Sequence, residues 1–131
     1  MEIKKKEFTY RGKTVEELLR LDVREFAKYL GSRERRTVLR QFQEIEKFVA
    51  RSKTKIEKNK SVKTHSRHFV IVPDMVGMKI HIHAGNKFVP VLITGEMLGH
   101  RLGEFALTRT RTKHSKAGVG ATKGTKHKSK K

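Results

Sequence analysis

The C-terminal end of this chain cannot build a hydrophobic core. From Phe105 onward it carries nine lysines and arginines and no acidic residue. Apolar residues nearly vanish after Ala106, and residues 115–131 are mostly Gly, Ser, Thr and Lys. Such a segment buries too little apolar surface to offset the conformational entropy lost on folding. We therefore expect residues 115–131 to form a disordered basic tail.

The net charge of +19 is distributed unevenly along the 131 residues. Residues 1–50 hold 13 basic and 9 acidic side chains, whereas residues 51–131 hold 19 and 4. Repulsion on this scale destabilises a compact chain unless a polyanion offsets it. The absence of cysteine excludes disulfides and thiolate metal sites. There is no apolar run long enough to span a bilayer and no signal-peptide core. We expect a cytoplasmic protein that binds nucleic acid and no membrane.

The first part of the chain has helical periodicity. Thr14 and Glu17 have the spacing of a capping box, and Asp22 can cap a second helix. Gly31 is expected to end that helix, and Ser32 to begin a third of roughly 18–20 residues. The apolar positions at helical spacing are Val23, Phe26, Ala27 and Leu30 in the second helix, and Val38, Leu39, Phe42, Ile45 and Val49 in the third, opposite an exposed face with Arg33, Arg36, Arg40, Glu44 and Lys47.

The second part changes to a period of two. Residues 51–66 hold six basic side chains and one acid, which predicts a linker or loop. Strands are expected over residues 69–72, 78–83 and 88–93, the last two joined by a turn at residues 84–87.

Two details refine this prediction. Pro90 cannot donate to a hydrogen-bond ladder, so its strand should lie at a sheet edge. Thr94 can cap a short helix carrying Met97, Leu98 and Leu102, with Gly103 in the left-handed conformation at its C-terminus.

The histidines do not form a recognisable metal or catalytic site. His81 and His83 would share one face of a strand, but zinc needs three or four converging ligands. His100 and Glu104 lie four residues apart without an activated nucleophile or a nucleotide-binding loop. We expect no enzyme activity, cofactor or metal, and interpret the histidines as hydrogen-bond donors beside phosphate or base edges.

The segment after the last predicted helix has the pattern of a backbone-binding arm. Cations alternate with threonines over residues 108–113, which we call the basic comb: Thr108, Arg109, Thr110, Arg111, Thr112 and Lys113. In an extended chain one edge would present cations to phosphates and the other would present hydroxyls. Counterion release on neutralising those phosphates would offset the repulsion. No helix-turn-helix, zinc-finger, basic-zipper or RRM pattern is present, and composition favours RNA over DNA only modestly.

Four ordered motifs carry a family resemblance. They are Pro73-Asp74-Met75-Val76-Gly77, Lys87-Phe88-Val89-Pro90-Val91, Gly99-His100-Arg101-Leu102-Gly103-Glu104-Phe105-Ala106 and Thr108-Arg109-Thr110. Over about residues 67–114 the chain resembles the universal small-subunit ribosomal protein number nineteen family. The first half, with Phe8-Thr9-Tyr10-Arg11-Gly12, is similar to the extension of archaeal and eukaryotic members, and the short Lys-rich C-terminus favours an archaeal type.

The resemblance implies an α+β fold, with an N-terminal helical segment followed by a small three-stranded sheet, a short helix and the basic tail. It implies a structural constituent of the small-subunit head that binds the 3′ major domain of small-subunit rRNA. The implied partners are small-subunit ribosomal protein thirteen, tRNA near the decoding region and large-subunit bridge elements. We expect an extension and helical segment over residues 1–52, an rRNA-binding core over 53–114 and a tail over 115–131.

The same resemblance marks the residues expected to contact rRNA. These are Arg67, His68, Lys79, Lys87, His100, Arg101, Arg109, Arg111, Lys113 and His114, to which composition adds Lys53, Lys55 and Lys63. Charge alone leaves two alternatives open. One is a free nucleic-acid-binding or chromatin-like basic protein, and the other is a basic RNA-modifying enzyme.

Overall fold

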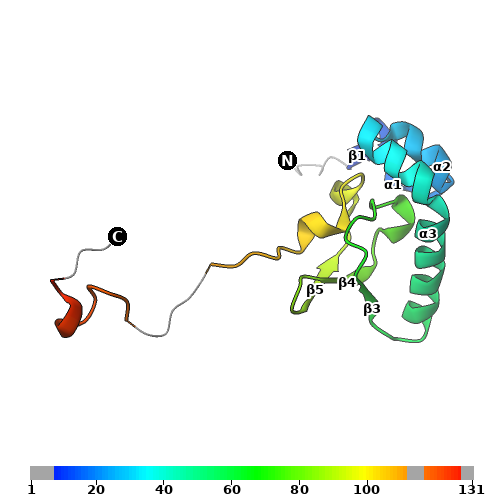
Figure 1. The fold of residues 1–131 in the computed structure, drawn as a ribbon. Helices are drawn as coiled ribbons and strands as arrows, with labels where there is room; N and C mark the ends of the chain where they lie inside the picture. The colour runs from blue at the N-terminus through cyan, green and yellow to red at the C-terminus, as the bar shows by residue number, and fades with distance from the viewer. Residues whose placement is uncertain (1–7, 112–116, 128–131) are drawn as a thin grey trace, which may run out of the picture.

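A computed structural model describes residues 8–111 and 117–127. The fold is α+β, as expected (Figure 1). Its helices and strands are β1 (Thr9–Tyr10), β2 (Lys13–Thr14), α1 (Val15–Leu19), α2 (Val23–Phe26), α3 (Ser32–Glu57), β3 (Val62–Thr64), β4 (Lys79–His83) and β5 (Phe88–Leu92). Short 3₁₀ turns occupy Ala27–Tyr29, Pro73–Met75, Gly95–Met97, Leu102–Phe105 and Lys123–Thr125. None of the helices in the described residues has the length and apolar character needed to cross a membrane.

The first two helices begin where their capping residues predict. The Thr14 hydroxyl accepts the Glu17 N–H at 3.3 Å, and the Asp22 N–H donates to the Glu25 carboxylate at 3.4 Å. The predicted apolar face of the second helix is confirmed as buried. That helix gives way to a 3₁₀ turn after four residues, and the Arg35 guanidinium donates to three main-chain carbonyls there. Those acceptors are the carbonyls of Ala27 at 3.1 Å, Lys28 at 2.8 Å and Leu30 at 3.2 Å.

Helix α3 is longer than predicted. It spans 26 residues with a kink at Gln41, so the expected linker over residues 51–66 is wrong. The first part of that segment forms the last turns of α3, and β3 follows. Ser52 is buried there against the rest of the fold, and Lys53 pairs with Asp74 at 2.7 Å. Within the helix, the Ser52 hydroxyl donates to the Phe48 carbonyl one turn earlier at 2.7 Å. The basic side chains in the helical part of this segment lie on its solvated face.

The buried face of α3 also differs from the prediction at two positions. Val38, Ile45 and Val49 are buried as expected. Leu39 is 46% exposed, and Phe48 is buried in the core instead. The Phe48 ring lies 5.7 Å from the Phe69 ring, so the buried face is set by contact with the chain that follows the helix.

The three-stranded sheet has the order β3-β4-β5, with β3 parallel and β5 antiparallel to β4. Its third member is β3, whereas the strand predicted over residues 69–72 is absent. That run is buried and pairs with residues 99–103 through one bridge between Val70 and Arg101. A continuous apolar run does not distinguish a buried strand from a buried loop. Strand β5 lies at the edge, as Pro90 predicted.

The connections explain two glycine positions. In the β4–β5 hairpin the Ala84 N–H donates to the Lys87 carbonyl at 2.8 Å, and Gly85 has φ +92°, which favours glycine. The helix predicted after Thr94 is a pair of 3₁₀ turns. Gly103 lies inside the second turn and not in the predicted left-handed conformation. A Cβ at Gly103 would lie 3.0 Å from the Arg67 carbonyl oxygen, so close packing explains this glycine.

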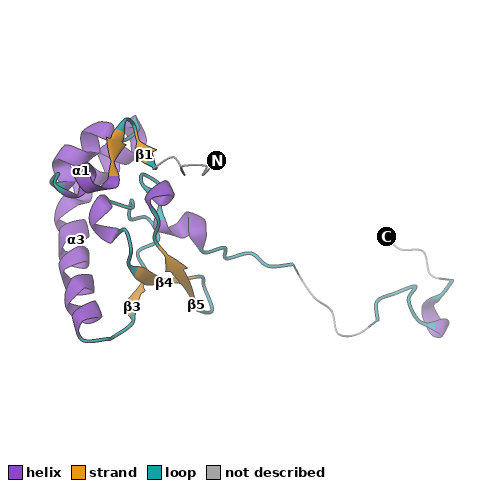
Figure 2. Cartoon of the chain, turned by 180° about the vertical axis from the view of Figure 1, so that it is seen from behind, coloured by secondary structure: helices purple, strands orange, loops and turns teal. Residues whose placement is uncertain are grey.

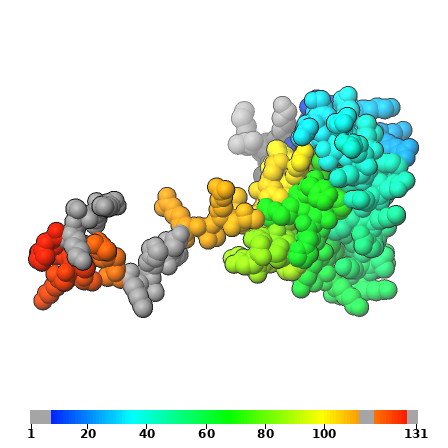
Figure 3. All heavy atoms as spheres, in the orientation of Figure 1, coloured from blue at the N-terminus to red at the C-terminus, as the bar shows by residue number. Residues whose placement is uncertain are grey.

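One cluster of buried apolar side chains, from Leu18 to Ala106, joins the helices to the sheet. Residue 52 lies inside α3, and buried residues on both sides of it belong to this cluster. Figure 3 shows the two halves as one continuous body. Seen from behind in Figure 2, residues 107–111 leave this body without helix or strand. Of the tail expected to be disordered, residues 117–127 are described and contain the 3₁₀ turn Lys123–Thr125.

Candidate nucleic-acid interface

Antiparallel pairing of residues 67–71 with residues 99–103 brings two predicted contacts together. The Gly103 N–H donates to the Arg67 carbonyl at 2.8 Å, and the Ile71 N–H donates to the His100 carbonyl at 2.8 Å. This pairing places His68 and Arg101 in one pocket facing α3. Neither segment forms a named strand, so the juxtaposition comes from loops held by main-chain hydrogen bonds.

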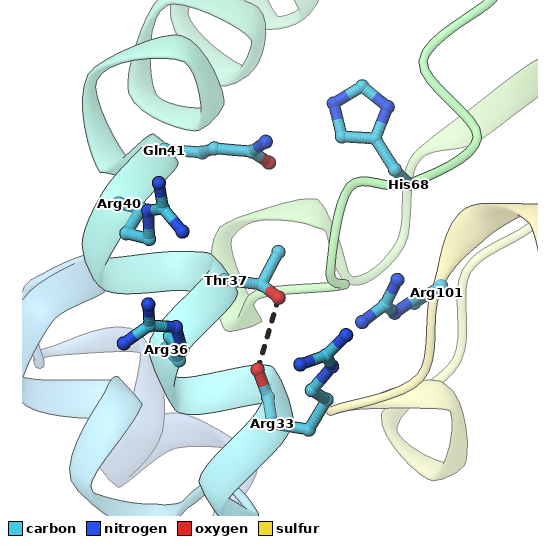
Figure 4. Close-up of a pocket in the computed structure, with 7 residues that line it drawn as sticks. All are labelled: Arg33, Arg36, Thr37, Arg40, Gln41, His68 and Arg101. Carbon is cyan, nitrogen blue, oxygen red and sulfur yellow. Dashed lines mark hydrogen bonds between the residues drawn. The ribbon is translucent and has the colours of Figure 1, made fainter.

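We call this concavity the arginine pocket. Its volume is about 520 Å³, and it is lined by Arg33, Arg36, Thr37, Arg40 and Gln41 of α3 and by His68 and Arg101 (Figure 4). The Arg33 and Arg101 guanidinium groups point toward one another in that view. Within residues 8–111 and 117–127, none of the four arginines forms an ion pair with a carboxylate. Converging cations without an acid between them favour an anion.

A buried acceptor lies in the same pocket. Gln41 Oε1 is inaccessible to solvent and has no hydrogen-bond partner among the described residues. The Gln41 side chain extends from the kink of α3 toward His68 (Figure 4). A buried acceptor left unpaired costs roughly 1–3 kcal/mol, and such groups are uncommon in folded proteins. The pocket therefore combines unpaired cations with an acceptor that needs a donor.

Arg67 has a different role from the pocket arginines. Its guanidinium donates to three main-chain carbonyls, those of His83 at 2.6 Å, Gly103 at 2.8 Å and Ala106 at 2.6 Å. These bonds connect the β4–β5 hairpin to the turn that precedes the comb. Because its donors serve the scaffold, we interpret Arg67 as a positioning residue.

The first residues of the comb lie beside the turn of the β4–β5 hairpin. Residues 84–87 and Leu107, Thr108 and Thr110 line a second cavity of about 520 Å³. Lys87, Arg109 and Arg111 are exposed beside it. We call Lys87 and residues 108–111 the hairpin–comb surface. Two further predicted contacts, Lys113 and His114, lie outside the described residues.

The remaining predicted residues are dispersed. Lys53 forms an ion pair with Asp74, and His100 forms one with Glu104 at 2.7 Å if protonated. The Lys63 ammonium lies 5.4 Å from the centre of the Phe88 ring. Lys55 and Lys79 are exposed on α3 and β4. No group of three or more potential metal ligands occurs in the part of the chain that the structure describes.

Five residues that line the arginine pocket were not predicted from the sequence: Arg33, Arg36, Thr37, Arg40 and Gln41. Arg33, Arg36 and Arg40 were assigned only to an exposed helical face, although their spacing of three and four residues aligns them along one side of α3. That alignment was the available signal for a basic ridge. Nothing in the sequence pattern distinguishes Gln41, because its burial depends on the chain packed against α3.

A comparison with known protein families identifies the family of the chain. The family described as Ribosomal protein S19 matches residues 31–114. This range contains α3, the three-stranded sheet, the whole arginine pocket and the hairpin–comb surface. It covers well over half of the chain. The protein therefore belongs to the ribosomal protein S19 family and is an rRNA-binding protein of the small ribosomal subunit.

Proposed function

We propose that this protein is a structural constituent of the small-subunit head and binds the 3′ major domain of small-subunit rRNA through the hairpin–comb surface. The proposal includes an archaeal-type, cytoplasmic protein that contacts small-subunit ribosomal protein thirteen. Its C-terminal tail extends toward the decoding region, where tRNA and the large-subunit bridge lie. Family membership supports the general role, and the resemblance of the sequence motifs supports these finer assignments.

One observation carries the RNA-binding part of this proposal. The three hydrogen bonds of the Arg67 guanidinium, which we call the Arg67 clamp, hold the base of the exposed cationic segment 107–111. The Arg67 hydrogen bonds and the buried Ala106 fix where the arm leaves the core. Arg109 and Arg111 then follow on exposed backbone without helix or strand. In an extended chain alternate side chains project to the same side and repeat every 6.6 Å or so. Such a repeat suits a series of phosphates along an RNA backbone.

Two measurements test the proposal. The full chain, expressed in its source cells, should cosediment with small subunits and assembled ribosomes on a density gradient. Purified protein should bind a transcript of the 3′ major domain more tightly than random duplex DNA of equal length at roughly 0.15 M salt. Absence from the small-subunit fractions would contradict the ribosomal assignment. Equal affinity for the two nucleic acids would instead favour a free, chromatin-like basic protein.

The contact with protein thirteen needs its own experiment. Reconstituted head particles containing both proteins should yield crosslinks between them, and a mixture of the two purified proteins without rRNA tests whether the contact needs RNA. Crosslinks only to rRNA in complete particles would contradict the proposed protein partner.

A further inference from the structure

We propose that the arginine pocket is a separate binding site for one rRNA nucleotide. In this site Arg33 and Arg101 hold the phosphate. The Gln41 amide, whose oxygen is inaccessible in the free protein, turns into the pocket on binding so that Oε1 accepts a hydrogen bond from the ribose or the base. The inference rests on the proposed rRNA-binding function and adds a second contact that shares no residue with the hairpin–comb surface.

The phosphate position follows from the two guanidinium groups. They point toward one another across the pocket from different elements, and no carboxylate in the described chain pairs with either (Figure 4). Guanidinium matches phosphate through paired N–H donors, which makes this contact directional as well as electrostatic.

Both arginines are placed by ordered backbone. Arg33 lies in the first turn of α3, and the Arg101 N–H donates to the Glu104 carboxylate at 3.2 Å. The backbone of Arg101 also forms an antiparallel β-bridge with Val70. The backbone of this site therefore loses little conformational freedom when its ligand binds, and the ordering cost falls on the two side chains.

The buried amide oxygen indicates what else the ligand must contain. Phosphodiester oxygens are acceptors and cannot satisfy Gln41 Oε1. A nucleotide supplies the missing donor through the ribose 2′-hydroxyl or a base N–H. The pocket volume of about 520 Å³ lies in the range of small-ligand sites, and the exposed His68 ring offers a surface for stacking. Inorganic phosphate or a carboxylate would leave the amide oxygen unpaired.

A pair of charge variants tests whether the pocket cations contribute more to RNA affinity than exposed cations elsewhere on the protein. The double variant Arg33→Gln/Arg101→Gln removes two pocket cations, and Lys28→Gln/Lys47→Gln removes two exposed cations outside it. Both are measured with the full chain and the 3′ major domain transcript across a salt series. The pocket variant should lose about tenfold or more in affinity, with a salt slope shallower by roughly one. The control should stay within about twofold of the unmodified chain.

A second variant keeps the charge constant. Gln41→Leu removes the unpaired acceptor, so the free protein should unfold at a temperature higher by about 2–4 °C. The same change should weaken transcript binding by about tenfold, because the bound donor loses its acceptor. A purely structural role for Gln41 would not produce these opposite effects.

Oligonucleotides identify the donor. Single-stranded RNA and DNA twelve nucleotides long, of one sequence, are compared with the unmodified chain and Gln41→Leu. Loss of the preference for RNA assigns the ribose 2′-hydroxyl, whereas an equal penalty with both assigns a base donor. Unchanged binding by Gln41→Leu to both oligonucleotides and the transcript overturns the inference, as does a charge effect no larger than the control. If the unmodified chain fails to prefer the transcript to duplex DNA, the proposed function fails and the inference falls with it.

Discussion

The arginine pocket and the hairpin–comb surface are both cationic, but they differ in shape and in how their side chains are held. The pocket is concave, draws its cations from α3 and a paired loop, and contains a buried amide. Residues 108–111 of the comb are exposed and leave the core without helix or strand. A fixed concave site selects a ligand by geometry, whereas an extended arm gains affinity from neutralised phosphates and adapts its shape. This difference in shape is the basis for proposing that the pocket recognises one nucleotide and that the comb follows an RNA backbone.

Two other arginines serve the scaffold. Arg35 and Arg67 each donate to three main-chain carbonyls, so three of the five N–H donors of each guanidinium already serve the scaffold. Positive charge in the sequence therefore overstates the number of cations that can bind rRNA.

The largest expected effect comes from removing the clamp that holds the comb. Arg67→Met leaves three carbonyls without their donor and should lower the free energy of unfolding by about 3 kcal/mol in urea denaturation. Arg67→Lys should recover only part of this loss, because an ammonium lacks the planar fork. A loss below about 0.5 kcal/mol for Arg67→Met would show that the clamp is not structural.

Reversing the comb should chiefly affect RNA binding. Arg109→Glu/Arg111→Glu is expected to weaken binding to the 3′ major domain transcript by about 100-fold and to reduce the salt slope by roughly one for each lost phosphate contact. Both side chains are exposed, so thermal unfolding should be unchanged. An unchanged salt slope would show that the comb does not touch phosphate.

A smaller effect tests the close approach between the pocket segment and the base of the comb. Gly103→Ala places a methyl group 3.0 Å from the Arg67 carbonyl oxygen and should cost about 1–2 kcal/mol of unfolding free energy. Gly118→Ala is the matched control, because its added methyl group meets open space. Equal stability of the two variants in urea denaturation would contradict the tight packing.

The smallest effect is expected at Lys53, whose ammonium is already paired. Lys53→Gln should change the unfolding free energy by less than about 0.5 kcal/mol, since both partners are partly exposed. Transcript affinity should change by less than about twofold if the Asp74 pair keeps this cation from RNA. A loss as large as that of the comb variant would place Lys53 in the RNA-binding surface.

Local patterns predicted the parts of the fold that depend on local contacts. The buried face containing Phe26 and Leu30, the β4–β5 hairpin and the edge position of Pro90 follow from spacing and turn chemistry. Residues 69–72 did not, because an apolar run is compatible with both a strand and a buried loop. The extension of α3 past residue 51 depends on packing against the rest of the fold, which buries Ser52.

The candidate site likewise has one part that local sequence patterns predict and one part that only the fold assembles. The comb was identifiable because alternating cations and threonines are a local pattern. The pocket joins residues 33–41 to residues 68 and 101, so its concavity appears only in the fold. The role of Arg67 likewise depends on carbonyls up to 39 residues away in sequence. Charge identifies candidate cations, but tertiary hydrogen bonds determine which of them a ligand can reach.

Crosslinking in intact ribosomes tests the central claim most directly. A photoreactive amino acid placed at Arg109 in one preparation and at Arg36 in another, followed by mapping of the attached nucleotides, reports where each surface lies. Two separate groups of nucleotides within the 3′ major domain of small-subunit rRNA are the predicted result. Crosslinks from both positions to rRNA outside that domain, or to protein alone, would contradict the account.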